Sequence, residues 1–424
     1  MQSMRHSRWH HSTAFVFILC SLGFSTPLLG QSSAPDPLFA RVPFQQWLAE
    51  GPQQQLPWKV IIWPERLSSH QRLLSYVEIV VPGKELIKRS GPGRFIGLVQ
   101  LTDNAGCVYQ NDGALDLGAG NPVDKKKDAY FAWGAFVLPG DYNMVVALYD
   151  RETGEHNLTQ RTLKVAALKN DPLPDAWRNL PSVEFMERAE KLDSSFHPEI
   201  RGRLHLPLEV QRPVQIELLV NLTPSEILTG SYRAYNFNLR ALMPILKIFS
   251  QIDVHKGAVN LATLDLTRQQ VSFEQSDINV NQLAWPELKE VLSAADPSKI
   301  DVQSLQGRKY NAAFLRDEVA RRIALHSEDQ EAKPIRVFIL LSSSVVFNAR
   351  DGLSEIDLPK ECDCLVYHVR YDWWRSQMAF DDIDKVLKPL KLRKFSATSP
   401  QGVRKALATI LNEIAKAGST PEVQ

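Results

Sequence analysis

Val214-Gln-Ile-Glu-Leu-Leu-Val-Asn-Leu-Thr-Pro-Ser225 is the stretch that decides the predicted fold of the second half of the chain. It is rich in apolar residues up to Asn221, and the turn-forming pair Thr223-Pro224 follows shortly after. A short apolar run bounded in this way is typical of a strand that is buried on both faces. Such strands belong to parallel sheets that are covered by helices, so the stretch indicates an α/β architecture.

The residues after this stretch alternate between helical and strand patterns. The periodicity predicts helices over residues 225–252, 286–295, 311–326, 381–387 and 399–417, and strands over 258–265, 270–274, 335–342, 364–370 and 392–397. This order predicts an α/β Rossmann-like domain over residues 212–417, with a mainly parallel sheet covered by helices on both faces. Residues 418–424 are expected to form a disordered tail.

The first half of the chain shows a different pattern. From Trp58 to about Leu168, short alternating apolar runs are separated by turn formers such as Pro82-Gly83 and Pro139-Gly140-Asp141. This spacing predicts an antiparallel, immunoglobulin-like β-sandwich over residues 58–168. We expect one short helix within residues 31–57, and we interpret the proline-rich and charged residues 169–211 as a connection laid over both domains. The predicted fold class is therefore multidomain, a β-sandwich followed by the α/β domain.

The N-terminus has the order of a secretory signal. A basic segment with Arg5 and Arg8 precedes an apolar run from Thr13 to Phe24, and small and polar residues follow around Gly30. Because the run is shorter than the roughly 20 residues that cross a bilayer, residues 1–30 are interpreted as a cleaved signal peptide. We expect a periplasmic or secreted protein, with no transmembrane span after cleavage.

The charge balance argues against nucleic acid as a partner. The formal net charge is +1, and loss of Arg5 and Arg8 would leave 1 − 2 = −1. A balanced chain of this kind lacks the basic footprint of a nucleic-acid-binding protein.

Four cysteines are present, and Cys20 lies in the predicted signal peptide. The remaining Cys107, Cys362 and Cys364 are odd in number, so a disulfide framework is not expected. Cys362 and Cys364 are two apart in a predicted strand, and their side chains therefore share a face. We interpret them as small hydrophobic residues; a metal or redox role is the alternative.

The order of elements over about residues 212–417 resembles a von Willebrand factor type A domain. In that family, an Asp-x-Ser-x-Ser motif after the first strand holds a divalent cation at a metal-ion-dependent adhesion site. The matching positions here are Asn221, Thr223 and Ser225. Asn221 replaces the carboxylate with a neutral amide, and a hard cation usually needs an anionic oxygen ligand. The resemblance therefore implies a degenerate site, and we expect neither a metal nor any other cofactor.

Two further family positions also lack their usual ligands. The resemblance places Arg308 where the family has a threonine, and Ser342-Ser343-Ser344 where the family has an aspartate. We interpret Arg308 as a possible substitute for the cation, because a guanidinium can hold a partner's carboxylate through two hydrogen bonds. The alternative is an ordinary solvated arginine at the start of a helix.

A catalytic constellation is not evident in the sequence. The histidines are scattered singly, which is typical of surface or core residues. Asp381, Asp382 and Asp384 stand where a helix is predicted to begin, so we interpret them as capping residues and not as a carboxylate pair for catalysis.

The carboxyl ends of parallel strands are where open α/β sheets bind ligands. Trp373, Trp374 and Arg375 follow the strand at 364–370, and tryptophan and arginine are common interface anchors. The predicted partner-binding residues are Asn221, Thr223, Ser225, Arg308, Ser342, Ser343, Ser344, Trp373, Trp374 and Arg375. The sequence therefore predicts an exported, non-catalytic module that binds a protein partner. A hydrolase using the same cleft and an envelope component that binds through its β-sandwich are the alternatives.

Overall fold

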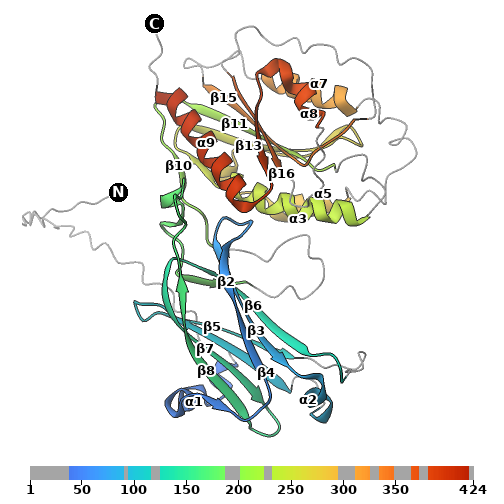
Figure 1. Ribbon diagram of the computed structural model, residues 1–424. Coiled ribbons are helices and arrows are strands. Elements are labelled where there is room, and N and C mark those ends of the chain that lie inside the picture. Colours follow the sequence, from blue (N-terminus) through green and yellow to red (C-terminus); the bar gives the residue numbers. More distant parts are fainter. Residues whose placement is uncertain are drawn as a thin grey trace, which may run out of the picture.

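A computed structural model describes most of the chain. The described residues are 38–89, 94–115, 125–186, 201–223, 232–294, 311–324, 334–347, 364–371 and 381–419. They form two stacked halves, with two β-sheets in the lower half of Figure 1 and a helix-flanked sheet in the upper half.

The lower half consists of two antiparallel sheets that pack face to face. One sheet has the strand order β1-β8-β7-β4-β5, and the other has the order β2-β3-β6-β9. Their strands are β1 (Gln53–Gln54), β2 (Lys59–Leu67), β3 (Leu73–Val81), β4 (Phe95–Thr102), β5 (Val108–Leu115), β6 (Ala129–Val137), β7 (Gly140–Asp150), β8 (His156–Val165) and β9 (Val183–Phe185). A short helix, α2 (Gly83–Lys88), joins β3 to β4.

Alternation of side chains along the strands builds the core between these sheets. Trp133 of β6 lies over Gly97 of β4, where the Cβ of any larger residue would come within 2.4 Å of the indole ring. The close packing of the two sheets at this point therefore requires glycine. On the outer face of the first sheet, α1 (Phe44–Glu50) and the turn η1 (Phe39–Arg41) cover a second apolar cluster that includes Trp47.

The upper half is built on a six-stranded sheet with the order β14-β13-β11-β15-β16-β17. Its strands are β11 (Val214–Asn221), β13 (Gly257–Asp265), β14 (Gln270–Gln275), β15 (Ile335–Ser342), β16 (Cys364–Tyr371) and β17 (Arg393–Ala397). The strands β13, β11, β15, β16 and β17 run parallel, whereas β14 turns back and pairs antiparallel with β13. A separate two-stranded parallel pair joins β10 (Leu206–Leu208) to β12 (Ile252–Val254).

Helices lie on both faces of the six-stranded sheet (Figure 1). The helices are α3 (Tyr232–Phe249), α4 (Ile278–Asn281), α5 (Trp285–Ala294), α7 (Asn311–Ala324), α8 (Ile383–Leu387), the turn η6 (Lys388–Leu390) and α9 (Pro400–Ser419). Residues of α3, α5 and α9 share one apolar cluster with Ile216 and Leu218 of β11. Residues of α7 and α8 share the opposite cluster with Leu219. Helix α9 continues two residues past its predicted end at residue 417.

A buried ion network ties α7 to the middle of the sheet. Glu217 interrupts the apolar run of β11, and its carboxylate accepts a hydrogen bond from Arg322 of α7 at 3.0 Å. Arg322 also donates to Glu318 at 2.7 Å and to Glu274 at 3.0 Å, while its own side chain is only 3% exposed. Hydrogen bonds to Arg321 and Arg322 outweigh the burial that by itself would raise the pKa of Glu318, so its pKa is lowered.

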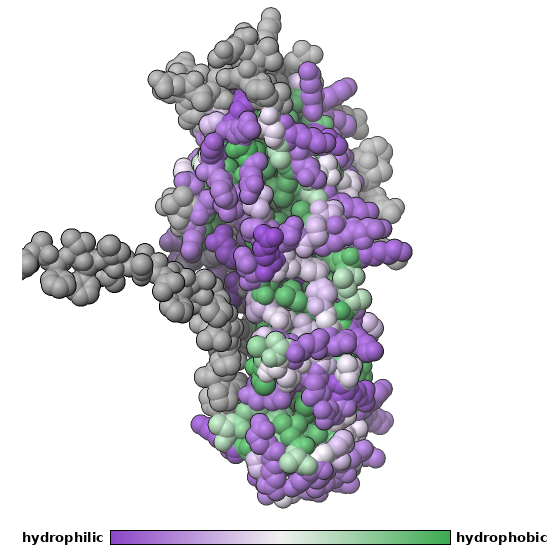
Figure 2. All heavy atoms as spheres, turned by 90° about the vertical axis from the view of Figure 1, so that its left-hand side faces the viewer, coloured by the Kyte–Doolittle hydropathy of each residue, from purple (hydrophilic) through white to green (hydrophobic). Residues whose placement is uncertain are grey.

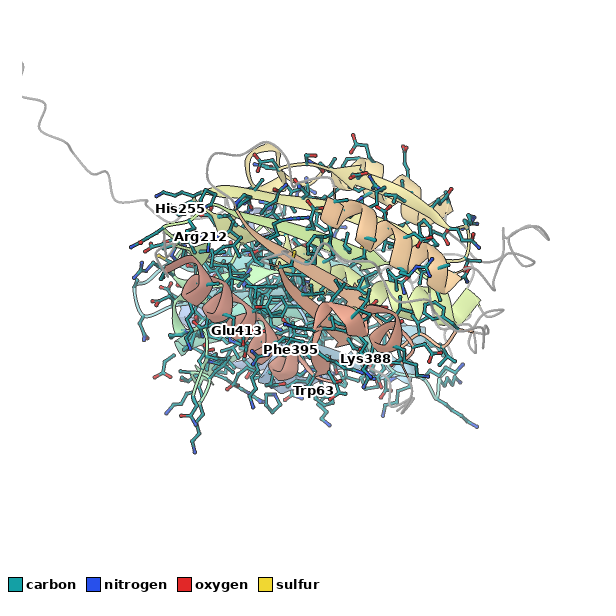
Figure 3. The ribbon with its side chains drawn as sticks, turned by 90° about the horizontal axis from the view of Figure 1, so that it is seen from above. Trp63, Arg212, His255, Lys388, Phe395 and Glu413 are labelled. Atoms are coloured by element: carbon teal, nitrogen blue, oxygen red, sulfur yellow. The ribbon has the colours of Figure 1, made fainter. Side chains whose placement is uncertain are left out.

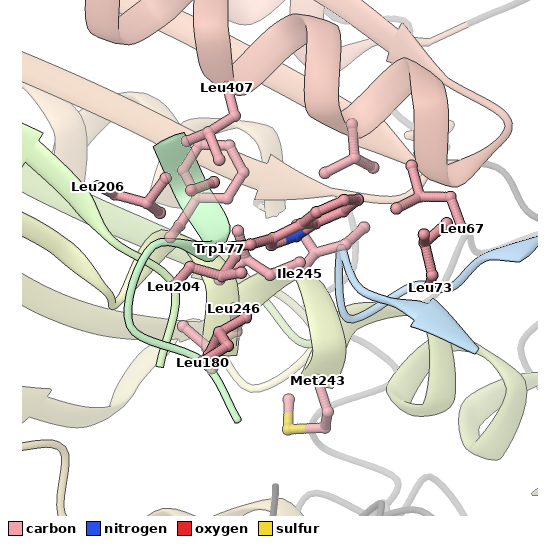
Figure 4. Packing of buried hydrophobic residues seen from close by; sticks show 14 of the residues in the cluster. Leu67, Leu73, Trp177, Leu180, Leu204, Leu206, Met243, Ile245, Leu246 and Leu407 are labelled. Atoms are coloured by element: carbon pink, nitrogen blue, oxygen red, sulfur yellow. The ribbon is translucent and has the colours of Figure 1, made fainter. Parts of the chain in front are cut away.

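The described residues of the connecting segment, 169–186 and 201–211, contact both halves. The turn η2 (Pro174–Trp177) places Trp177 between the sandwich and α9, among apolar side chains from both halves (Figure 4). The carboxylate of Asp171 accepts two hydrogen bonds from Arg404 of α9, at 2.5 and 2.7 Å. Gln71, in the turn between β2 and β3, donates to the backbone carbonyl of Pro400 at 2.9 Å. The two halves therefore share one continuous core.

This architecture corrects the predicted fold class. The described strands form four sheets with antiparallel or mixed pairing, apart from the small parallel pair β10–β12. The expectation of a Rossmann-like parallel domain that follows a separate sandwich is therefore wrong. The short turn between β13 and β14 makes the large sheet mixed. The segment expected to be a connection adds β9 to a sandwich sheet and β10 to the parallel pair.

The cysteine prediction also needs correction. Cys364 at the start of β16 forms a disulfide, so it is not a simple hydrophobic residue. Cys107, in the turn between β4 and β5, is exposed and carries a free thiol. Cys20 and Cys362 lie outside the described residues.

On the face shown in Figure 2, hydrophilic residues cover much of the molecule, and apolar residues show in patches on the lower half. Trp63 and Tyr130 of the sandwich are 49% and 60% exposed. Figure 3 shows Trp63 toward the same side of the molecule as Phe395 and Glu413. None of the helices in the described ranges is both long and apolar enough to span a membrane.

Candidate functional site

The structure places five of the ten predicted binding residues at the carboxyl edge of the six-stranded sheet. Asn221 and Thr223 follow from β11, and Ser342, Ser343 and Ser344 follow from β15. These two strands are neighbours and run parallel, so their ends meet. The other five residues, Ser225, Arg308, Trp373, Trp374 and Arg375, lie outside the described residues.

Asn221 is the centre of a buried hydrogen-bond network. Its side-chain amide donates to Ser342 Oγ at 3.0 Å and to the backbone carbonyl of Thr223 at 3.0 Å. Its Oδ1 accepts from the backbone N–H of Thr223 at 2.9 Å. Ser342 Oγ in turn donates to the backbone carbonyl of Ser343 at 2.7 Å. The side chains of Asn221 and Ser342 are completely buried. The network therefore satisfies their polar groups at the carboxyl ends of β11 and β15.

Asp265 adds the carboxylate that the sequence reasoning missed at this edge. It ends β13, and its Oδ1 lies 3.5 Å from Thr223 Oγ1. Arg268 neutralises it, with Nη1 2.7 Å from Asp265 Oδ2 and its backbone N–H 3.0 Å from Oδ1. The predicted strand pair at 258–265 and 270–274 located this turn, but the spacing of Asp265 and Arg268 suggested no role.

These contacts decide what the carboxyl edge can do chemically. A hard cation needs several oxygen ligands that are free to bind it, usually with at least one carboxylate. The amide of Asn221 is committed to three hydrogen bonds, and the carboxylate of Asp265 is paired with a guanidinium. The polar groups at this edge are thus engaged with one another and not free to bind a cation.

A second cluster of polar groups lies on the α8 side of the same sheet. His368 of β16, Asp381 and Asp384 at the start of α8, and Lys394 of β17 come together there. His368 Nδ1 is 3.0 Å from Asp384 Oδ1 and 3.8 Å from Asp381 Oδ2. Lys394 Nζ forms a hydrogen bond with Asp384 and lies 3.9 Å from Asp381 Oδ2. Arg370 lies 3.9 Å from the same oxygen.

Burial differs between the two carboxylates, and so do their pKa values. The side chain of Asp381 is completely buried, and this desolvation raises its pKa. Asp384 is 30% exposed. Burial alone would raise the pKa of Asp384 as well, but hydrogen bonds from His368 and Lys394 outweigh it, and its pKa is lowered.

The interpretation of the three aspartates as helix caps holds only in part. Asp381 Oδ1 accepts from the backbone N–H of Ile383 at 3.2 Å, as a capping carboxylate does. Asp382 makes no side-chain cap hydrogen bond and accepts instead from the backbone N–H of Phe347 at 2.8 Å. Asp384 binds His368 and Lys394. His368 stood alone in the sequence, and only the pairing of β16 with β17 brings it beside Lys394.

The chain matches no protein-family model and no curated protein. Similar solved structures include the PilB minor pilin from Streptococcus sanguinis (11% identity, 88% of this chain and 91% of that chain, TM-score 0.27). They also include a family 123 glycoside hydrolase from Clostridium perfringens (8% identity, 80% and 72%, TM-score 0.23). A structural genomics target named SoR45 covers 26% of this chain and 86% of its own (16% identity, TM-score 0.16). These similarities are too low to support an argument about fold or function.

Proposed function

We propose that this chain is an exported, non-catalytic binding protein that engages a protein partner at the carboxyl edge of its six-stranded sheet. The observation that carries the proposal is the closed network around Asn221, in which the amide and its neighbours bind one another. A catalytic or cation-binding edge needs uncommitted polar groups. A binding edge needs a rigid support, and this network provides one.

Two features support export. The basic, apolar and small-residue regions of the first 30 residues have the order of a signal peptide. Cys364 forms a disulfide, and disulfides persist mainly in oxidising compartments.

The shared core holds the two halves in one orientation. This favours a role in which a partner recognises the shape of the protein surface. Arg404, Asp171 and Trp177 fix the orientation of the upper half on the sandwich. Rigid presentation of a surface lowers the conformational entropy that is lost on binding.

A capture experiment tests the proposal. The full chain is used as bait in an extracytoplasmic extract, beside a Trp373→Ala/Trp374→Ala/Arg375→Ala variant and a Trp63→Ala/Tyr130→Ala control on the exposed sandwich surface. Binding at the carboxyl edge predicts that the first variant loses the partner and the control retains it. If the control loses the partner and the first variant retains it, the interface lies on the sandwich and the proposal is wrong.

Arg308 provides a finer test once a partner is known. If Arg308 holds a partner's carboxylate in a desolvated pair, Arg308→Ala weakens binding by about 2 kcal/mol or more. Arg308→Lys restores little of this loss, because the two-pronged geometry of the guanidinium is missing. An unchanged affinity in the alanine variant rules this role out.

A hydrolase is the second candidate function, favoured by one observation. Asp381 is a buried carboxylic acid with a raised pKa beside His368, a combination that acid–base catalysis can use. However, Nδ1 of His368 is held by Asp384, and Nε2 is buried. Measurable ester or glycoside hydrolysis that disappears in His368→Gln would support the enzyme and contradict the non-catalytic proposal.

A further inference from the structure

Three potential ligand atoms converge on the α8 side of the sheet. His368, Asp381 and Asp384 each offer one ligand atom, and these atoms lie within 4.8 Å of one another. His368 Nδ1 is 3.8 Å from Asp381 Oδ2 and 3.0 Å from Asp384 Oδ1. His368 is completely buried, and Asp384 connects the cluster to solvent with 30% of its side chain exposed. The resemblance of the sequence to a cation-binding family concerned the Asn221 edge and did not involve these residues.

An unsatisfied oxygen points into this cluster. Asp381 Oδ2 is buried and has no hydrogen-bond partner among the described residues. Side-chain nitrogen atoms of His368, Arg370 and Lys394 lie 3.8 to 3.9 Å from this oxygen, beyond hydrogen-bond distance. A buried carboxylate oxygen without a donor is unfavourable, and a bound cation would satisfy it.

The set of ligand atoms favours a transition metal over a hard cation. One imidazole nitrogen and two carboxylate oxygens are common ligands of Zn²⁺, which binds through three protein groups when a fourth position remains open. Calcium and magnesium prefer six or more oxygen ligands. We propose that His368, Asp381 and Asp384 form a Zn²⁺ site at the start of α8, and that Lys394 competes with the metal for Asp384.

Lys394 explains how the cluster remains stable without metal. Its ammonium group forms a hydrogen bond with Asp384 and supplies a positive charge beside both carboxylates. The side chain is 32% exposed, so it can move into solvent when a divalent cation takes its place. A divalent cation would also stabilise the carboxylate of Asp381 more than the single charge of Lys394 does.

The affinity is limited by the second nitrogen of His368. When Nδ1 binds the metal, the proton resides on Nε2, and this atom is buried without a hydrogen-bond partner among the described residues. Strong zinc sites usually give that N–H an acceptor. We therefore expect Zn²⁺ to bind here roughly 10- to 100-fold more weakly than at a site whose histidine N–H has an acceptor.

The test is a Zn²⁺ titration of the purified full chain by calorimetry, with Co²⁺ absorption as a report of the ligand geometry. One equivalent of Zn²⁺ binds the native chain. His368→Gln and Asp384→Asn weaken binding by tenfold or more, since each removes one of three ligands. Lys394→Met strengthens it by roughly tenfold, because the competing charge is gone.

His255→Gln is the matched control, because His255 is an exposed histidine two positions from an aspartate, Asp253 of β12. It leaves binding unchanged, whereas adventitious surface binding would fall in this variant and persist in His368→Gln. Circular dichroism verifies the fold of each variant, and Lys394→Met tests the proposal even if Asp384→Asn fails to fold. Absence of stoichiometric Zn²⁺ binding in both the native chain and Lys394→Met would overturn the site, as would an unchanged affinity in His368→Gln.

Discussion

The guanidinium of Arg404 lies over the indole ring of Trp177, with its central carbon 4.8 Å from the ring centroid. Trp177 comes from the connecting segment, and its Nε1 donates to the backbone carbonyl of Gln71 in the sandwich at 2.7 Å. Arg404 comes from α9 of the upper half and also binds Asp171. One arginine therefore links both halves to the segment that connects them, so its removal is expected to affect the whole molecule.

Arg404→Ala should lower the free energy of unfolding by about 3 kcal/mol, because it leaves the carboxylate of Asp171 partly buried without its partner. Lys405→Ala, at the exposed neighbouring position, should change the free energy by less than about 0.5 kcal/mol. Denaturant unfolding followed by tryptophan fluorescence measures both. Equal effects in the two variants would mean that the junction contributes little to stability.

The same ion pair predicts a pH dependence. Burial alone would raise the pKa of Asp171, but hydrogen bonds from Arg404 outweigh it and hold the pKa below its usual value of 3.8. A carboxyl group with a lowered folded-state pKa stabilises the fold while ionised, and this contribution is lost as the pH falls through the folded-state pKa. The stability difference between the native chain and Asp171→Asn should therefore be constant near neutral pH and shrink below about pH 4. A difference that does not vary between about pH 7 and pH 2 would contradict this assignment.

Arg322→Ala should destabilise the upper half by about 3 kcal/mol or more, because Glu217 and Glu318 would stay buried without their shared cation. The matched control is Arg321→Ala. Arg321 also binds Glu318, but it is 47% exposed, and its loss should cost under about 1 kcal/mol. Thermal unfolding of both variants provides the comparison, and a larger loss in Arg321→Ala would show that the buried network is not the important one.

Asn221→Asp should destabilise the fold by about 2 kcal/mol, since a carboxylate cannot donate the hydrogen bonds that the amide gives to Ser342 and Thr223. The exposed Asn143→Asp serves as a control with little effect.

Millimolar magnesium or calcium should not shift the melting temperature of the native chain, whereas a ligand at a hundredfold excess over its Kd would add about 2.7 kcal/mol. A clear upward shift with either ion that persists in His368→Gln would show that the carboxyl edge binds a cation.

The mature protein should begin near Gln31 and be recovered outside the cytoplasm. The order of residues in the first 30 positions motivates this prediction. N-terminal sequencing of protein from the native host measures it directly. An intact Met1 in the mature product would refute the cleavage, and with it one of the two supports for export.

Local periodicity located many elements of the upper half. The apolar runs at residues 214–221 and 335–342 coincide with β11 and β15, and the helix expected at residues 311–326 is described as α7 over Asn311–Ala324. The long helix expected from Ser225 is described only from Tyr232. The sequence predicted Asn221 and Ser342 at the carboxyl edge of one sheet, and the structure joins them by a hydrogen bond.

The sequence by itself determined where strands and helices form, because the spacing of apolar residues depends only on neighbours along the chain. Only the tertiary structure decided that His368 meets Asp384 and that Arg404 meets Asp171 from 233 positions away. Side chains of the same type with the same local spacing can end up paired or apart. Which of these occurs depends on the path of the chain between them, and local spacing does not encode that path.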